Sequence, residues 1–191
     1  MIYSFFRLLS IIVIKIFARV EVKGGDSIPL KGAFIMASNH LSNIDPFLLG
    51  AISPRRLNYL AKEELFKGPF ISALFYFMKA FPVKRNKADI SALRNCLNLL
   101  KNNEPMLVFP EGTRASNTDK IYAGVGFLVK KSGVPVIPAR VYNTDKVLAR
   151  GQKFPRFAKV KVIFGKPLKF GKEKDPEQIA RDILSVIKTL D

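Results

Sequence analysis

Residues 37–46, with the sequence ASNHLSNIDP, contain the only histidine of this 191-residue chain, His40, and an aspartate five positions later, Asp45. In one continuous helix, a five-residue step would place the two side chains about 140° apart, on different faces. The carboxylate can therefore reach the imidazole only if the chain bends between them. The apolar run 33–37 predicts a short buried strand. We expect His40 to follow a strand end and a helix to begin near Ser42 or Asp45.

A histidine held by a carboxylate can remove a proton from a hydroxyl group near pH 7, because the carboxylate stabilises the imidazolium. The sequence has no G-x-S-x-G motif that would supply a nucleophilic serine, so the hydroxyl would belong to a substrate. Alternatives remain open for both residues. His40 could be a structural histidine, and Asp45 could only cap a helix, since Asp45-Pro46 is typical of a helix start and Ser42 with Asp45 fits a capping box.

A second polar stretch, FPEGTR at residues 109–114, directly follows the apolar run 106–108. A loop there would lie at the carboxyl edge of a sheet, where open α/β sheets bind ligands. Arg114 could bind a phosphate through two parallel hydrogen bonds, and Glu111 could hold a hydroxyl or orient Arg114. An ordinary turn is the alternative for these six residues.

Two more stretches are strand-like, and the first of them also ends in charged residues. Residues 80–85 (AFPVKR) are strand-like and end in two cations, Lys84 and Arg85, which could complete a phosphate site or simply lie exposed. Residues 134–139 (VPVIPA) are apolar, and structural packing is the favoured interpretation.

The rest of the chain must position these residues. Short apolar runs alternate with helical patterns, which predicts an α/β protein with a largely parallel central sheet flanked by helices. Predicted strands cover residues 20–23, 33–37, 57–61, 80–83, 106–109, 134–141 and 159–164. Predicted helices follow Asp45, Glu63, Asp89, Ile121 and Pro176.

Composition narrows the possible partners. The chain has 32 Lys and Arg against 15 Asp and Glu, a formal net charge of +17. Such an excess indicates an anionic partner: nucleic acid, an acidic membrane surface, or phosphorylated substrates and acidic carriers. The single cysteine, Cys96, excludes an intrachain disulfide and a cysteine-based zinc site, and its helical context favours a buried thiol. We expect no metal site.

The first 19 residues predict an amphipathic helix at a membrane interface, and we divide the chain into this helix (1–19) and one domain (20–191). On a helical wheel the three cations fall within an arc of about 120°, and they are Arg7, Lys15 and Arg19. The opposite side is apolar: Phe5, Leu9, Ile12, Val13, Ile16 and Val20. The charge-free run is far short of the ~20 residues of a spanning helix. Packing of the apolar face on the protein's own core is the alternative.

Taken together and in this order, the four stretches resemble the glycerolipid acyltransferase superfamily, and most of all its lysophosphatidic acid acyltransferases. The resemblance covers roughly residues 20–170, and the pairing of HLSNID with FPEGTR is what makes it specific. It implies that His40 is the general base and that Asp45 orients it. It also implies a binding site for the glycerol phosphate made by Arg85, Glu111, Gly112, Thr113 and Arg114.

The resemblance implies a reaction as well: transfer of a fatty acyl group from a thioester, acyl-CoA or acyl-acyl carrier protein, to the free hydroxyl of lysophosphatidic acid. No metal or redox cofactor is implied, and the enzyme would sit on the cytoplasmic face of an anionic membrane. Residues 63–81 would lie near the acyl chain, with a core helix as the alternative. The chain departs from the family pattern at three positions: Lys79 stands where the family usually has glycine, Lys84 where it often has aspartate, and Ala115 where it usually has serine. These departures would affect acceptor preference more than chemistry.

Two other functions stay open from the sequence. The same chemistry could act on glycerol 3-phosphate or on another lysolipid. A noncatalytic module that binds acidic lipid or nucleic acid is the rival of another class, although the sequence contains no recognisable nucleic-acid motif and we expect no nucleic-acid partner.

Overall fold

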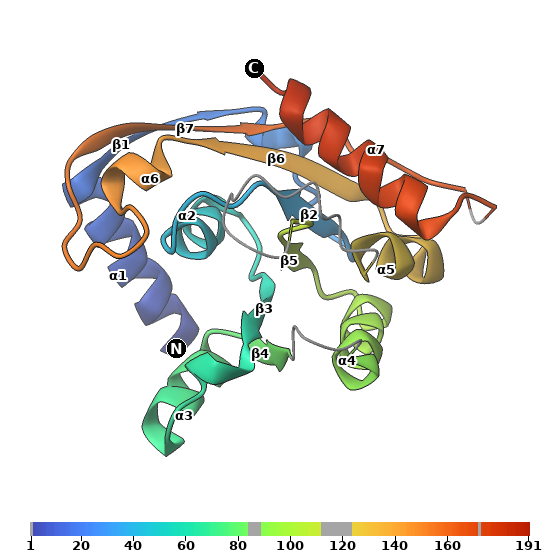
Figure 1. The fold of residues 1–191 in the computed structure, drawn as a ribbon, viewed down its shortest axis with the longest axis horizontal. Helices are drawn as coiled ribbons and strands as arrows, with labels where there is room; N and C mark the ends of the chain where they lie inside the picture. Colours follow the sequence, from blue (N-terminus) through green and yellow to red (C-terminus); the bar gives the residue numbers. More distant parts are fainter. Residues whose placement is uncertain (1, 84–88, 112–123, 172) are drawn as a thin grey trace.

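The computed structural model describes residues 2–83, 89–111, 124–171 and 173–191, with the backbone alone for residues 2–6. At the centre of this described part lies a seven-stranded sheet with the strand order β1-β7-β6-β2-β5-β3-β4 (Figure 1). All neighbouring strands are parallel except the antiparallel pair β6 and β7. The prediction of a largely parallel sheet is confirmed. The strands are β1 (Ala18–Lys23), β2 (Ile35–Ser38), β3 (Asn58–Lys62), β4 (Ala80–Val83), β5 (Met106–Val108), β6 (Val136–Tyr142) and β7 (Ala158–Phe164).

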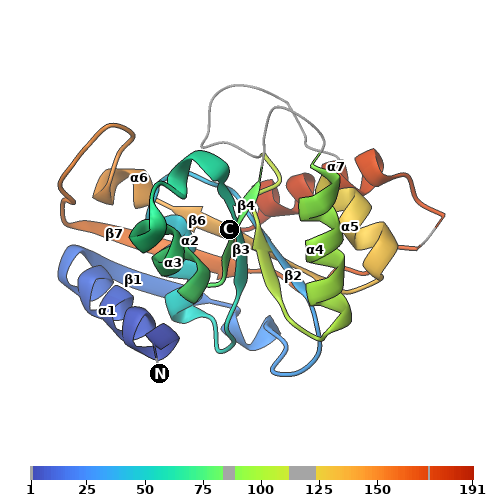
Figure 2. The same ribbon diagram turned by 90° about the horizontal axis from the view of Figure 1, so that it is seen from below.

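Helices cover both faces of the sheet (Figures 1 and 2). The α-helices of the described residues are α1 (Ile2–Phe17), α2 (Asp45–Ile52), α3 (Pro69–Phe77), α4 (Ile90–Lys101), α5 (Gly124–Ser132), α6 (Thr144–Val147) and α7 (Pro176–Thr189). Two short 3₁₀ helices, Gly25–Ser27 and Glu63–Leu65, complete the set. The predicted helices are all present. The sequence pattern missed α6, because four residues are too few to show a helical period.

Strand β2 lies in the middle of the sheet and contributes to both hydrophobic cores. Phe34 and Met36 pack on the side of α2, whereas Ile35 and Ala37 pack on the side of α4, α5 and α7. Side chains alternate between the faces of a strand, so a strand covered on both faces needs an unbroken apolar run. Cys96 of α4 belongs to the second core, where burial raises the pKa of its thiol to about 12. The prediction of a buried thiol is confirmed.

Helix α1 packs on the protein through one side only. Ile14 and Phe17 contact the first hydrophobic core, and the Arg7 guanidinium donates hydrogen bonds to the carbonyl oxygens of Ala51 and Ser53 at 3.2 and 3.0 Å. The carbonyl groups at a helix C-terminus lack partners within the helix and carry partial negative charge, so an arginine there stabilises the end of α2.

This arrangement corrects the predicted cationic stripe of the N-terminal helix. Arg7 binds α2 instead of facing outwards, and Arg19 belongs to β1 because α1 already ends at Phe17. Of the three cations only Lys15 stays exposed on α1. Like their neighbour Leu8, four residues of the predicted apolar face are nevertheless exposed to solvent: Leu9, Ile12, Val13 and Ile16. Val20 belongs to β1 and packs partly against the first core. The Phe5 side chain lies outside the described residues.

Among the residues that the structure describes, no helix has the length and apolar character needed to cross a membrane.

Candidate active site

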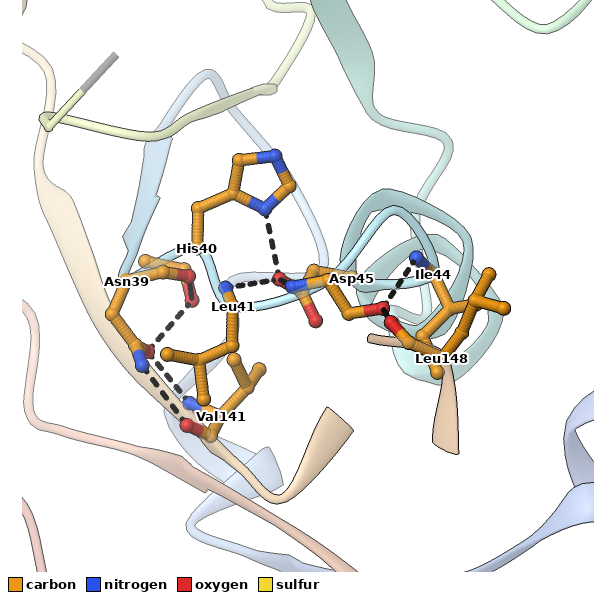
Figure 3. Close-up of polar contacts among 9 residues, drawn as sticks. Asn39, His40, Leu41, Ile44, Asp45, Val141 and Leu148 are labelled. Atoms are coloured by element: carbon orange, nitrogen blue, oxygen red, sulfur yellow. Dashed lines mark hydrogen bonds and ion pairs between the residues drawn. The ribbon is translucent and has the colours of Figure 1, made fainter. Parts of the chain in front are cut away.

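His40 and Asp45 lie in a bend between β2, which ends at Ser38, and α2, which begins at Asp45. The Asp45 Oδ2 atom accepts three hydrogen bonds: from His40 Nδ1 at 2.8 Å and from the backbone N–H groups of Leu41 and Ser42 at 2.7 and 2.8 Å (Figure 3). The Asp45 side chain is fully buried and that of His40 is mostly buried. The bend that the sequence requires is therefore present, and it brings the carboxylate to the imidazole.

Asp45 combines the two roles that the sequence left as alternatives. Its bond from the Ser42 N–H is one half of a capping box. The other half is absent, since the Asp45 N–H donates to the Ser42 carbonyl oxygen at 3.2 Å and Ser42 Oγ accepts from the Ile44 N–H at 3.4 Å. The Ser42 hydroxyl itself donates to the carbonyl oxygen of Leu148 at 2.6 Å, and Ile44 is the N-cap residue. The oxygen that accepts the backbone bonds also holds His40, so capping fixes the position of the orienting carboxylate.

The contact with Asp45 decides which ring nitrogen of His40 can act on a substrate. In the neutral imidazole one nitrogen carries the proton and the other accepts a hydrogen bond. Donation from Nδ1 to the carboxylate leaves Nε2 as the free acceptor. The ring is also stacked on Phe109, with centroids 4.1 Å apart and planes inclined by 20°. Phe109 lies at the end of a predicted strand and at the start of the FPEGTR stretch, and neither pattern indicates this contact.

The sheet explains why residues from distant motifs meet here. Strands β2 and β5 are adjacent and parallel, with Ala37 opposite Val108. The residues that follow the two strands, His40 from one and Phe109 and Glu111 from the other, therefore emerge at the same edge of the sheet. The pKa of Glu111 lies above its ordinary value because burial disfavours the charged form, an effect that the charges of Lys188 and His40 partly offset.

Of the five residues expected to bind the glycerol phosphate, Glu111 alone belongs to the described part of the chain. The other four, Arg85, Gly112, Thr113 and Arg114, lie outside the described residues. Lys84 and Ala115, two of the departures from the family pattern, lie outside them as well. Residues 136–139 of the apolar VPVIPA stretch are buried in β6, as structural packing requires.

The third departure, Lys79, has a structural explanation. Its backbone adopts φ +60°, in the left-handed region where glycine is the favoured residue. The lysine is held there by an ion pair between its Nζ atom and Glu104 Oε2, 2.6 Å apart, and that hydrogen bond is the main reason that the pKa of Glu104 lies below its ordinary value. Lys79 therefore ties β4 to the turn before β5.

Asn39, like Phe109, has a role in the site that its sequence context does not indicate. Its side-chain amide forms two hydrogen bonds with the backbone of Val141: Asn39 Nδ2 donates to the carbonyl oxygen at 2.9 Å, and Oδ1 accepts from the N–H at 2.8 Å (Figure 3). The amide thus continues the pairing of β2 with β6 by one position beyond Ser38. Because His40 is the next residue, this clamp determines where the imidazole leaves the sheet.

We expect replacement of Asn39 by alanine to lower kcat by about tenfold or more on a protein that still folds, because small displacements of a catalytic group are costly. The lost pair of hydrogen bonds should also lower the free energy of unfolding by about 1–3 kcal/mol. Steady-state kinetics and denaturant unfolding measure both effects. The exposed Asn98 on α4 provides the control, since Asn98→Ala removes an amide of the same type. An unchanged kcat in Asn39→Ala would contradict the positioning role.

A pocket of about 630 Å³ opens beside His40. His40, Phe109 and Arg150 line it, and it extends between α2 and β3 towards Arg7 and Ser10 of α1. Its apolar lining includes Leu65, Phe75 and Met78, all from the segment 63–81 that the resemblance associates with an acyl chain. Gly50 lets the Tyr59 side chain pack closely against α2, because a Cβ atom there would lie 2.1 Å from the Tyr59 hydroxyl oxygen.

Comparisons with known proteins place this site in a family. Residues 19–142 match the family model described as Acyltransferase. The chain is 30% identical over 150 residues to 1-acyl-sn-glycerol-3-phosphate acyltransferase from Bacillus subtilis, covering 78% of this chain and 73% of that protein. It is 31% identical over 137 residues to the Saccharomyces cerevisiae protein of the same name, covering 68% of this chain but 45% of the yeast protein.

The fold has a counterpart among solved structures. The crystal structure of the 1-acyl-sn-glycerophosphate (LPA) acyltransferase PlsC from Thermotoga maritima superposes with a TM-score of 0.76 at 23% identity, covering 99% of this chain and 81% of that one. Family model, relatives and fold agree with the motifs that surround His40, and the chain belongs to the acyltransferase family.

Proposed function

We propose that the protein transfers a fatty acyl group from a thioester to the free hydroxyl of lysophosphatidic acid, giving phosphatidic acid. The observation that carries the proposal is the 2.8 Å contact of His40 Nδ1 with a fully buried carboxylate, in the wall of a largely apolar pocket. An oriented base beside an apolar pocket suits a reaction that joins a hydroxyl group to a hydrocarbon chain. The names of the relatives support the acceptor.

The residues of the site perform the transfer in two steps. His40 Nε2 accepts the proton of the acceptor hydroxyl while the oxygen attacks the carbonyl carbon of the thioester. Asp45 keeps the Nδ1 proton in place and stabilises the imidazolium that forms. When the tetrahedral intermediate collapses, the carbon–sulfur bond breaks and the imidazolium returns the proton to the departing thiolate. The products are an ester and a free thiol, and the balance requires no metal or redox cofactor.

The pocket is the place we assign to the acyl chain. Its apolar residues Leu65, Phe75 and Met78 would exclude water from the hydrocarbon. The thioester group would then lie next to His40, with the rest of the donor, coenzyme A or acyl carrier protein, outside. Glu111, at the same edge of the sheet, would contact the acceptor.

We assign the membrane interface to α1. Its exposed side carries Leu9, Ile12 and Ile16, while Ile14 and Phe17 attach the helix to the domain. A lysolipid and its diacyl product both reside in a bilayer, so an enzyme at the surface need not extract either one completely. We assign the enzyme to the cytoplasmic face of the membrane, where it would use a soluble thioester donor.

The test of the function is acyl transfer by the purified full-length chain with a panel of donors and acceptors. We expect transfer from acyl-CoA or acyl-acyl carrier protein to lysophosphatidic acid to exceed transfer to glycerol 3-phosphate and to lysophosphatidylcholine. Formation of phosphatidic acid, followed by thin-layer chromatography, is the readout. A preference for one of the other acceptors would contradict the acceptor assignment and leave the chemistry intact, whereas no transfer to any acceptor would refute the function.

A further inference from the structure

The loop between α6 and β7, residues 148–157, exposes two phenylalanines. Phe154 is 80% exposed and Phe157 is 68% exposed. The segment around them, LARGQKFPRF, interleaves these rings with three exposed cations: Arg150, Lys153 and Arg156. Large aromatic side chains that protrude together from a protein surface, accompanied by positive charge, indicate a binding surface for an apolar and anionic partner.

Both ends of this α6–β7 loop are attached to the body of the protein. At its start, the Leu148 carbonyl oxygen accepts the bond from Ser42, in the bend that holds His40. Near its end, the backbone N–H of Arg156 donates to the Val147 carbonyl oxygen at 2.7 Å. Between these points Ala149 and Gln152 exchange two hydrogen bonds, each of 3.1 Å. The protruding rings therefore sit on an anchored support.

The loop lies at the same end of the molecule as α1, as both views of the fold show (Figures 1 and 2). One pocket connects the two, since Arg150 of the loop, Arg7 of α1 and the catalytic candidate His40 all line it. Helix α1 and the loop therefore each contribute side chains to the wall of one site.

We propose that the α6–β7 loop is a second membrane-insertion element, in which Phe154 and Phe157 enter the lipid interface and the cations bind lipid phosphates. The inference rests on the proposed function, which makes the acceptor a membrane lipid. Aromatic rings suit the boundary between headgroups and acyl chains, and each cation near an anionic surface adds to the binding. Two contacts, α1 and this loop, then fix the orientation of the pocket entrance towards the bilayer.

An acidic carrier protein is the other class of partner that the loop's charge would fit. Such a partner would bind the cations, but it would give no reason for two protruding phenylalanines beside an exposed apolar helix. The combination of rings, charge and position favours the lipid surface.

The absence of tryptophan from the sequence makes the proposal directly testable, because each Phe→Trp variant of the full-length chain contains one fluorescent probe. With vesicles of phosphatidylcholine and phosphatidic acid, Phe154→Trp and Phe157→Trp should show a blue-shifted emission that brominated lipids quench. Ile90→Trp is the matched control. Ile90 is 67% exposed at the start of α4, which lies away from the loop in both views. Its emission should stay unchanged.

A binding experiment gives the second readout. Phe154→Ser combined with Phe157→Ser should lower the vesicle partition coefficient by about tenfold or more, whereas Ile90→Ser should leave it unchanged. Unshifted emission from both loop variants, on protein that floats with the vesicles, would overturn the proposal. A shift that acyl carrier protein produces and vesicles do not would overturn it too, in favour of a protein partner.

These measurements do not depend on catalysis. If the loop probes insert while the native chain transfers no acyl group, the membrane element stands and the proposed function fails. If transfer to lysophosphatidic acid proceeds while the probes remain in water, the proposed function stands and the insertion of the loop fails.

Discussion

Replacement of His40 by alanine is expected to lower acyl transfer by on the order of 10²–10⁴-fold, because it removes the base that accepts the proton of the acceptor hydroxyl. Asp45 keeps two of its three hydrogen bonds in this variant, those from the N–H groups of Leu41 and Ser42, so the bend should persist. Single-turnover kinetics measure the loss, and circular dichroism shows whether the protein is folded. A folded His40→Ala protein with near-normal turnover would refute the mechanism.

Substitutions of Asp45 separate its orienting role from its capping role. Asp45→Asn keeps an oxygen for the backbone donors but cannot stabilise the imidazolium, so we expect a loss of activity similar to that of His40→Ala with little loss of stability. Asp45→Ala leaves buried N–H groups without an acceptor, at a cost of about 1–3 kcal/mol for each one. The free energies of unfolding of the two variants should therefore differ although both are inactive. Equal stabilities would contradict the backbone role of Oδ2.

The second large effect concerns the exposed side of α1. Changing Leu9, Ile12 and Ile16 together to serine should weaken binding to anionic vesicles by about 10²-fold or more, since burial of each apolar side chain contributes on the order of 1 kcal/mol or more. High salt should weaken the binding of the native chain without eliminating it, because salt screens the charges and leaves the apolar contribution. Flotation of full-length protein measures both effects.

These point variants are preferable to deletion of residues 1–18. Deletion would also remove the Arg7 bonds to the end of α2 and the packing of Ile14 and Phe17, so loss of membrane binding could not be separated from loss of the fold. Serine in place of Leu30 and Ile90, both exposed elsewhere, is the matched control. If the α1 triple variant binds vesicles as the native chain does, α1 is not the membrane anchor.

The elements of the fold could be predicted from the sequence because each depends on local patterns. Every strand of the sheet overlaps a strand predicted from the sequence, and α4 and α7 begin after Asp89 and Asp175, whose side chains accept backbone N–H bonds in the first turn. The bend between His40 and Asp45 followed from helix geometry alone. Since two side chains five positions apart in a helix face different ways, only a bend lets them meet.

The sequence also determined the family, because the order and spacing of the motifs around His40 and residues 109–114 can be read without a structure. It could not assign Asn39 a partner, since Val141 is separated from it by 102 positions and the two meet only because β2 and β6 are neighbours in the sheet. Phe109 likewise reaches the His40 ring only because β5 lies on the other side of β2.

Only the tertiary structure decided which side of α1 faces the domain and which side is exposed. A helical wheel gives the angle between side chains but not the side that faces the domain, and charge suggested that Arg7 faces the headgroups. The end of α2 supplied carbonyl groups that no pattern within residues 1–19 could reveal, and Arg7 turned inward to bind them. The outward side is therefore apolar with one cation, Lys15, and the charge that would complement a lipid surface lies on the neighbouring α6–β7 loop. The side of α1 that faces the domain therefore depends on residues that are distant in the sequence and that the fold brings next to the helix.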